Sequence, residues 1–220
     1  MFDSIKRLIG SSPAKQDEGL ALATWAKSQS LVFKRVKDKS GGGYVVETDK
    51  GWRVEWGASQ RPYIAGKELR FRCDTGLPGD VQMIMVSKVV AQTLESDVFS
   101  RFTNAMQTQI DNTLPDEMRW LAMHPKVSLS VSPLLAKRFV LFCNAEAVAQ
   151  NCLNPDTVRE LESAASNWWA DGLLLVLTLN RGMLTMRMPG QPIESAQLQM
   201  VGKLFAHLAD RMRLVASEMR

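Results

Sequence analysis

Apolar and polar positions alternate with a period of two through the first third of the chain. Trp52, Val54 and Trp56 are separated by charged residues, and the segment 67–73 repeats the pattern. This period is typical of half-buried strands in an antiparallel sheet. Further strands are predicted where strand-favouring residues cluster between short turns, over 31–37, 44–48 and 81–86. Because the connections are short, these segments predict an antiparallel sheet over about residues 31–86.

After Ser87 the apolar period lengthens to about four residues. Val90 and Leu94 begin a stripe that continues to Ile110, which predicts a long amphipathic helix over 88–110. Leu114-Pro115 restarts the chain. Beyond it the pattern fits a short helix over 117–123 and, after Pro125, a strand over 126–131.

Residues 138–188 combine strand and helix signals within one compact unit. The apolar run 139–142 predicts a strand, and Asn144 stands where the N-cap of a helix over 145–150 belongs. Asn154, followed by Pro155, predicts the start of a second helix that runs to Trp168. The continuous apolar run 173–179 predicts a strand buried on both faces, and a turn at 180–182 returns the chain over 183–188.

The last predicted element is a helix over 194–217. Its apolar stripe consists of Val201, Leu204, Phe205, Leu208, Met212 and Val215. A single amphipathic helix is stable mainly through the surface on which its stripe packs. The hairpin just before it offers an apolar face, so we expect the helix to pack there.

Together these elements predict an α+β protein. An N-terminal antiparallel sheet with a long helix is followed by a second αβ unit with a strand hairpin and a C-terminal helix. The expected divisions are an N-terminal helical segment and linker (1–30), the sheet with its helix (31–112) and the second unit (113–220). The pattern leaves open whether the last two form one core. Residues 1–10 fit a short amphipathic helix that docks on its own domain or, alternatively, touches a membrane surface.

Composition places the chain among ordinary globular proteins. Its 220 residues include 45% hydrophobic and 23% charged residues, with a formal net charge of +4. That charge is weak for a nucleic-acid binder, and we expect none to be bound. The three cysteines form no C-x-x-C pair, which favours free thiols. No membrane span is expected, and Lys6 and Arg7 interrupt any secretion signal, so we expect a cytoplasmic protein.

Motifs for catalysis or metal binding do not emerge from the sequence. Neither His124 nor His207 lies in a zinc-binding pattern, and Gly41-Gly42-Gly43 lacks the remainder of a phosphate-binding loop. Cys143 sits where a thiolate would be stabilised, but a buried thiol is the simpler interpretation without a histidine partner. We therefore predict no catalytic residue, no metal and no cofactor.

Basic side chains are the most distinctive polar feature of the predicted sheet. Arg53, Arg70 and Arg72 fall on the polar faces of neighbouring strands, while Arg61 and Lys67 fall near the connecting turns. Pairing of the strands would gather these five residues into a surface for phosphate or carboxylate groups. The alternative interpretation is the solvated face of a half-buried sheet.

Three segments carry a resemblance to known sequences. The runs RVEWGASQRPYIAGKELRFR (53–72) and QTQIDNTLPDEMRWLAMHPKV (107–127) are similar to a group of uncharacterised bacterial proteins of this size. Residues 128–188 resemble, more loosely, the C-terminal part of a bacterial domain of unknown function, in which a phrase like RFVLFCNAEAVAQNCLNPDTVREL precedes a hairpin. The resemblance implies a shared fold and a bacterial source, and it implies no chemistry.

A non-enzymatic binding or adaptor protein is the function that these observations favour, with a protein partner of unknown identity. The first alternative is an enzyme whose site is assembled from distant residues around Arg70, Arg72, Asp74 and Glu117. The second is a module that binds anionic ligands or a lipid surface through the basic face of the sheet. Oligomeric state is not indicated by any pattern in the sequence.

Overall fold

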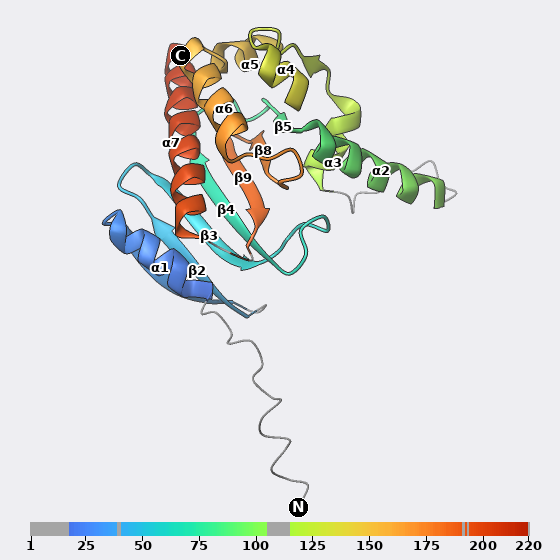
Figure 1. The fold of residues 1–220 in the computed structure, drawn as a ribbon. Helices are drawn as coiled ribbons and strands as arrows, with labels where there is room; N and C mark the ends of the chain where they lie inside the picture. The colour runs from blue at the N-terminus through green and yellow to red at the C-terminus, as the bar shows by residue number, and fades with distance from the viewer. Residues whose placement is uncertain (1–17, 39–40, 105–114, 191, 193, 220) are drawn as a thin grey trace, which may run out of the picture.

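One antiparallel sheet of nine strands connects both halves of the chain in the computed structural model (Figure 1). The structure describes residues 18–38, 41–104, 115–190, 192 and 194–219. The spatial order of the strands is β1-β2-β3-β4-β9-β8-β5-β7-β6. The strands are β1 (Val32–Asp38), β2 (Gly41–Glu47), β3 (Trp52–Ala58), β4 (Lys67–Asp74), β5 (Met83–Ser87), β6 (Lys126–Val127), β7 (Phe139–Cys143), β8 (Val176–Asn180) and β9 (Met183–Pro189).

The sheet is larger than predicted, and its order corrects the predicted position of β5. Strands β1 to β4 form the expected meander, but the hairpin β8–β9 lies between β4 and β5. The reason is burial on both faces: all five residues of β5 are buried, so this strand suits an interior position between β8 and β7. β4 instead pairs along its whole length with β9.

Seven helices are described, and they divide between the two faces of the sheet. They are α1 (Glu18–Ser28), α2 (Lys88–Asn104), α3 (Asp116–Met123), α4 (Pro133–Arg138), α5 (Glu146–Cys152), α6 (Pro155–Asn167) and α7 (Ser195–Glu218). The helical face carries the buried side chains of Trp52, Phe71 and Met186 and is covered by α1 and by α4 to α7. The opposite face, which we call the polar face, is covered by α2 and α3 over β5 and β7, and Val176 of β8 belongs to the same buried cluster. None of the described helices is long and apolar enough to cross a bilayer.

The C-terminal helix α7 buries the six apolar positions of its predicted stripe. It packs on β4 and reaches Trp52 of β3, so the hairpin is not its main partner in the sheet, which corrects the prediction (Figure 1). The ring of Phe205 lies 5.6 Å, between centroids, from the rings of both Trp52 and Phe71. A Cβ on Gly202 would come within 3.3 Å of Trp25, so this glycine allows the close approach of α7 and α1.

Of the two asparagines predicted to cap helices, one does so in the structure and the other does not. Asn154 caps α6 as predicted, because its Oδ1 accepts the Thr157 N–H at 2.9 Å. Asn144 does not cap α5. Its side-chain amide instead binds the N–H of Gln82 and the carbonyl of Asp80, which holds two loops together.

One further predicted segment ends differently in the structure, and two others lie partly or wholly outside the described residues. The strand over 126–131 is limited to β6, because Ser132 accepts the Leu135 N–H and starts the unpredicted helix α4. The long helix is described to Asn104 as α2, and its predicted last turns lie outside the described residues. The predicted N-terminal helix over 1–10 also lies outside them.

Candidate functional site

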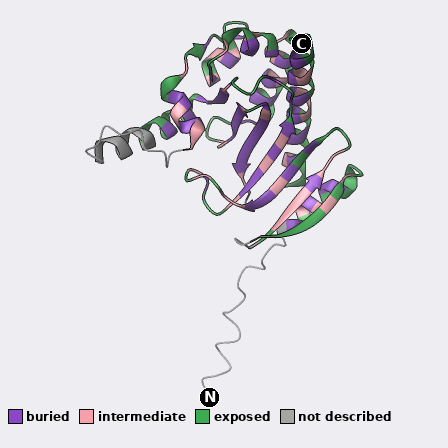
Figure 2. Cartoon of the chain, turned by 180° about the vertical axis from the view of Figure 1, so that it is seen from behind, coloured by how far each residue is buried: buried purple, intermediate pink, exposed green. Residues whose placement is uncertain are grey.

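The polar face of strands β3, β4 and β9 is open where Arg53 and Arg72 lie, whereas Glu68, Thr185 and Arg187 on the same face are buried. In Figure 2 the centre of the sheet is seen from this side, with no helix drawn across it. Directly paired residues of neighbouring strands share a face, so the register defines what this side presents. Glu55 lies opposite Arg70, which in turn lies opposite Arg187. The apolar residues that alternate with these charged positions are buried under α7 and its neighbours.

A chain of ion pairs runs across this open face. The carboxylate of Glu55 forms ion pairs with three arginines, with Arg53 Nε at 2.7 Å, Arg70 Nε at 3.2 Å and Arg72 Nη1 at 3.5 Å. Glu68 is completely buried and lies between Arg70 Nε, at 3.2 Å, and Arg187 Nη1, at 2.9 Å. Arg70 therefore joins two carboxylates, although its buried Nε–H is aimed well at neither.

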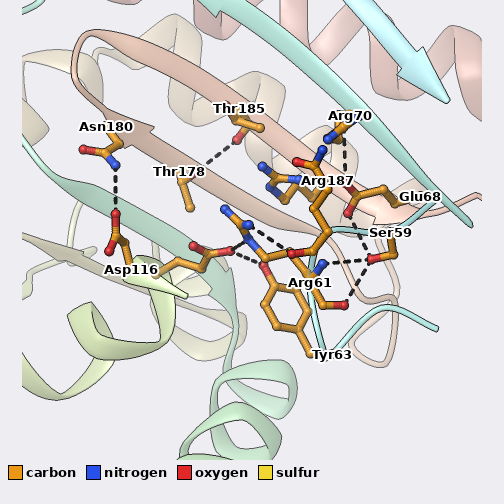
Figure 3. A network of polar contacts seen from close by, with 12 residues as sticks. Ser59, Arg61, Tyr63, Glu68, Arg70, Asp116, Thr178, Asn180, Thr185 and Arg187 are labelled. Carbon is orange, nitrogen blue, oxygen red and sulfur yellow. Dashed lines mark hydrogen bonds and ion pairs between the residues drawn. The ribbon is translucent and has the colours of Figure 1, made fainter. Parts of the chain in front are cut away.

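The loop 59–66 extends this network to α3 (Figure 3). Ser59 Oγ lies 3.3 Å from Glu68 Oε2, and the loop then carries Arg61 and Tyr63 between the sheet and α3. Both side chains donate to Glu117: Arg61 through Nε and Tyr63 through its hydroxyl at 2.6 Å. Glu117 is buried by these contacts.

The surroundings shift the pKa values of three groups in this network. Burial, and then the neighbouring Glu117 carboxylate, raises the pKa of Tyr63 well above its usual value. Burial acts to lower the pKa of Arg61, but the Glu117 carboxylate outweighs it, so the pKa is raised. The pKa of Arg187 is lowered by burial and by the nearby Arg61. The raised pKa values keep Tyr63 neutral and Arg61 charged near neutral pH.

The structure brings three of the five predicted basic residues together. Arg53, Arg70 and Arg72 meet at Glu55, and Arg61 lies on the same side but is held by Glu117. Lys67 does not join them. It lies on the helical face, where its Nζ is 5.2 Å from the centroid of the Trp56 ring.

Sequence reasoning missed Glu68 and Arg187 as members of this site. The two-residue period of β4 places Glu68 on the same face as Arg70, so a signal for Glu68 was present. No sequence signal pointed to Arg187. It lies beside Arg70 only because β4 pairs with β9, and the two residues are 117 positions apart in the sequence.

Comparisons with known proteins support the fold. No family model and no curated protein sequence matches the chain. Among solved structures, it is similar to the crystal structure of the mycobacterial trehalose monomycolate transport factor A, TtfA, with a TM-score of 0.50. The identity is 12%, and the match covers 91% of this chain and 97% of that one. At this identity the likeness shows the fold alone.

The side chains proposed for a metal site or a dispersed active site have separate positions and partners in the described part of the chain. No three of its His, Cys, Asp and Glu side chains are grouped to hold a metal ion. Of the residues proposed for a dispersed active site, Arg70 and Arg72 meet at Glu55, Asp74 accepts the Gly76 N–H, and Glu117 is held by Arg61 and Tyr63.

Histidine and cysteine side chains are likewise engaged or buried. His124 Nε2 lies 3.0 Å from Gln82 Oε1, and His207 Nε2 lies 3.2 Å from Thr157 Oγ1. Burial raises the pKa of the Cys143 thiol, and it raises the pKa of Cys152 to about 11. Thiols of this kind are protonated at neutral pH and are poor nucleophiles.

Proposed function

We propose that the chain is a non-enzymatic binding protein that docks an acidic segment of a partner protein on the open part of its polar face. The observation that carries the proposal is an imbalance of charge in the network described above. Its cations are Arg53, Arg61, Arg70, Arg72 and Arg187, and its anions are Glu55, Glu68 and Glu117. An excess of arginine on one face attracts and orients an acidic partner.

The position of the excess charge favours binding over a purely structural role. At the buried end each carboxylate has an arginine as its ion-pair partner, as expected because an unpaired buried charge is costly. At the open end the side chains of Arg53 and Arg72 are 49% and 34% exposed. Arginines in such places are enriched in protein interfaces, because the planar guanidinium forms paired hydrogen bonds with carboxylates.

Apolar side chains border the same open face. The register places Val32 opposite Glu47, Glu47 opposite Arg53, and Arg53 opposite Arg72, so all four share this side. Val32 and Val36, which follows the same parity on β1, are exposed. A charged centre with apolar neighbours is a common composition for a protein-docking surface.

A fluorescein-labelled peptide of ten glutamates tests the proposal by fluorescence anisotropy. We expect saturable binding that weakens at least tenfold in the double variant Arg53→Glu/Arg72→Glu. The matched control is Arg35→Glu/Arg159→Glu, which changes the net charge equally at exposed positions outside the open face. Equal weakening in both double variants would mean non-specific attraction to a basic protein, and the proposal would be wrong.

A further inference from the structure

The geometry points to a specific oxyanion subsite formed by Arg53 and Arg72, which receives one phosphate or carboxylate group. This inference deepens the proposed docking function, since it names the group on the partner that the open face recognises. Its test uses small anions, so the subsite and the docking function can fail separately.

The first argument is the pairing of like charges across two strands. Arg53 lies directly opposite Arg72 in the register of β3 and β4. Like charges in this position repel one another and destabilise a sheet unless an anion lies between them. The anion present is Glu55 Oε1, which contacts Arg53 at 2.7 Å and Arg72 at 3.5 Å.

Glu55 leaves much of the donor capacity of these arginines unused. Each guanidinium carries five N–H donors, and this single carboxylate also faces Arg70. The 3.5 Å contact of Arg72 is longer than a charge-assisted hydrogen bond, which is typically about 2.7–2.9 Å. A second oxyanion could therefore accept N–H groups from both arginines without displacing Glu55.

The second argument is a cleft beside the two arginines, with a volume of about 380 Å³. It lies where β3 begins and β4 ends, and both Arg53 and Arg72 line it, together with Gly51 and Met183. This volume accommodates a phosphate or carboxylate group with part of the molecule that carries it.

Among the described residues that line this cleft, Arg53 and Arg72 are the two cations, and Glu47 and Asp74 are the two anions. Glu47 on β2 is paired with Lys34, and Asp74 Oδ1 accepts the Gly76 N–H at 3.0 Å. A further guanidinium, that of Arg213 on α7, reaches the same end of the sheet.

Each of the three side-chain nitrogens of Arg213 has a backbone acceptor at this position. It donates to the carbonyls of Lys50, Gly51 and Asp74 at 2.7 to 3.3 Å. Its charge nevertheless adds to the positive potential at the mouth of the cleft. Glu47 therefore has a cationic partner and Asp74 a backbone donor, whereas Arg53 and Arg72 share the single carboxylate of Glu55.

The subsite is tested by NMR of the arginine Nε–Hε groups during titration with inorganic phosphate and, separately, with acetate. We expect saturable shifts of the Arg53 and Arg72 signals, which are assigned by their loss in Arg53→Gln and Arg72→Gln. The double glutamine variant should bind phosphate at least tenfold more weakly, while Arg159→Gln should bind as the wild type does. An unchanged thermal midpoint confirms that the variants are folded.

The two anions separate the possible sources of the group. Phosphate binding at least fivefold tighter than acetate assigns the site to phosphate groups, and comparable binding assigns it to carboxylates. Small, unsaturable shifts spread over all exposed arginines would overturn the subsite. If phosphate binds here but the decaglutamate peptide does not, the subsite stands and the docking function fails. If the peptide binds the double glutamine variant as tightly as wild type, the subsite fails and docking on the face remains.

Discussion

The two faces of the sheet differ in composition and in what covers them, although the same strands form both. On the helical face, alternate residues of β3, β4 and β9 are large and apolar, and α7 packs on them with the rings of Phe71 and Phe205 in contact. On the polar face, the intervening residues are mostly arginine, glutamate and threonine, and none of the described helices covers them. A sheet with one apolar layer can fold without the second face being apolar, which leaves that face available for recognition.

The polar face is also divided within itself. Toward α3, Glu68, Arg187 and Glu117 are buried and each has close partners. Toward β1, Arg53 and Arg72 share the largely buried carboxylate of Glu55, while their own side chains reach solvent. Substitutions should therefore reduce the free energy of unfolding most on the helical face, less at the buried end of the network and least at Arg53 and Arg72. Their effects on partner binding should follow the opposite order.

The largest loss of stability is expected for Phe205→Ala. This buried ring contacts Trp52 and Phe71, so truncation leaves a cavity in the main core and should destabilise the fold by about 4 kcal/mol. Leu214→Ala, at an exposed position of the same helix, should change stability by less than about 0.5 kcal/mol. Urea unfolding monitored by tryptophan fluorescence measures both. Similar midpoints for the two variants would contradict the packing of α7 on β3 and β4.

The next largest loss is expected for Glu68→Gln, on the order of 3 kcal/mol, because it leaves Arg187 buried without its counter-charge. The matched control is Glu47→Gln, which breaks the exposed pair with Lys34 on the same face and should cost less than about 1 kcal/mol. The same unfolding experiment gives both values. A small effect at both positions would show that the network is solvated throughout.

Tyr63→Phe should have a smaller and pH-dependent effect. Loss of the hydrogen bond to the buried Glu117 should destabilise the fold by about 1.5 kcal/mol near pH 7. The raised pKa of Tyr63 in the folded protein means that the unfolded chain loses the hydroxyl proton first. The contribution of Tyr63 to the free energy of unfolding is therefore fully present below about pH 10 and declines as the pH rises above that value.

Unfolding midpoints of wild type and Tyr63→Phe at pH 8 and pH 10.5 test the sign of this linkage. The wild type should be the more stable at pH 8, and its advantage should shrink at pH 10.5. An advantage that grows with pH would mean that the tyrosinate is favoured in the folded state, contrary to its burial beside a carboxylate.

Much of this division could be predicted from sequence, since strand period alone places Trp52 and Phe71 on one side and Arg53, Arg70 and Arg72 on the other. The same period assigns Lys67 to the apolar side, which its position near a predicted turn obscured. What could not be predicted depends on pairing between distant strands. The continuous apolar run of β5 signals burial on both faces but does not say which strands flank it.

The remaining members of the ion-pair network also could not be predicted from the sequence. Arg187 reaches Glu68 only because β9 pairs with β4, and Glu117 reaches Arg61 only because α3 packs near the loop 59–66. Local patterns also do not distinguish two similar asparagines: Asn154 caps a helix, whereas Asn144 joins two loops. In each case the deciding partner is remote in the chain.

The most direct test of the division between a stabilising face and a binding face is the affinity of Arg53→Gln/Arg72→Gln for the decaglutamate peptide, measured with its unfolding midpoint. Two exposed arginines that share one acceptor should contribute less than about 1 kcal/mol to stability. We therefore expect the midpoint to stay close to that of the wild type while peptide affinity falls at least tenfold. A lowered midpoint with unchanged affinity would show that these arginines hold the sheet together and do not bind a partner.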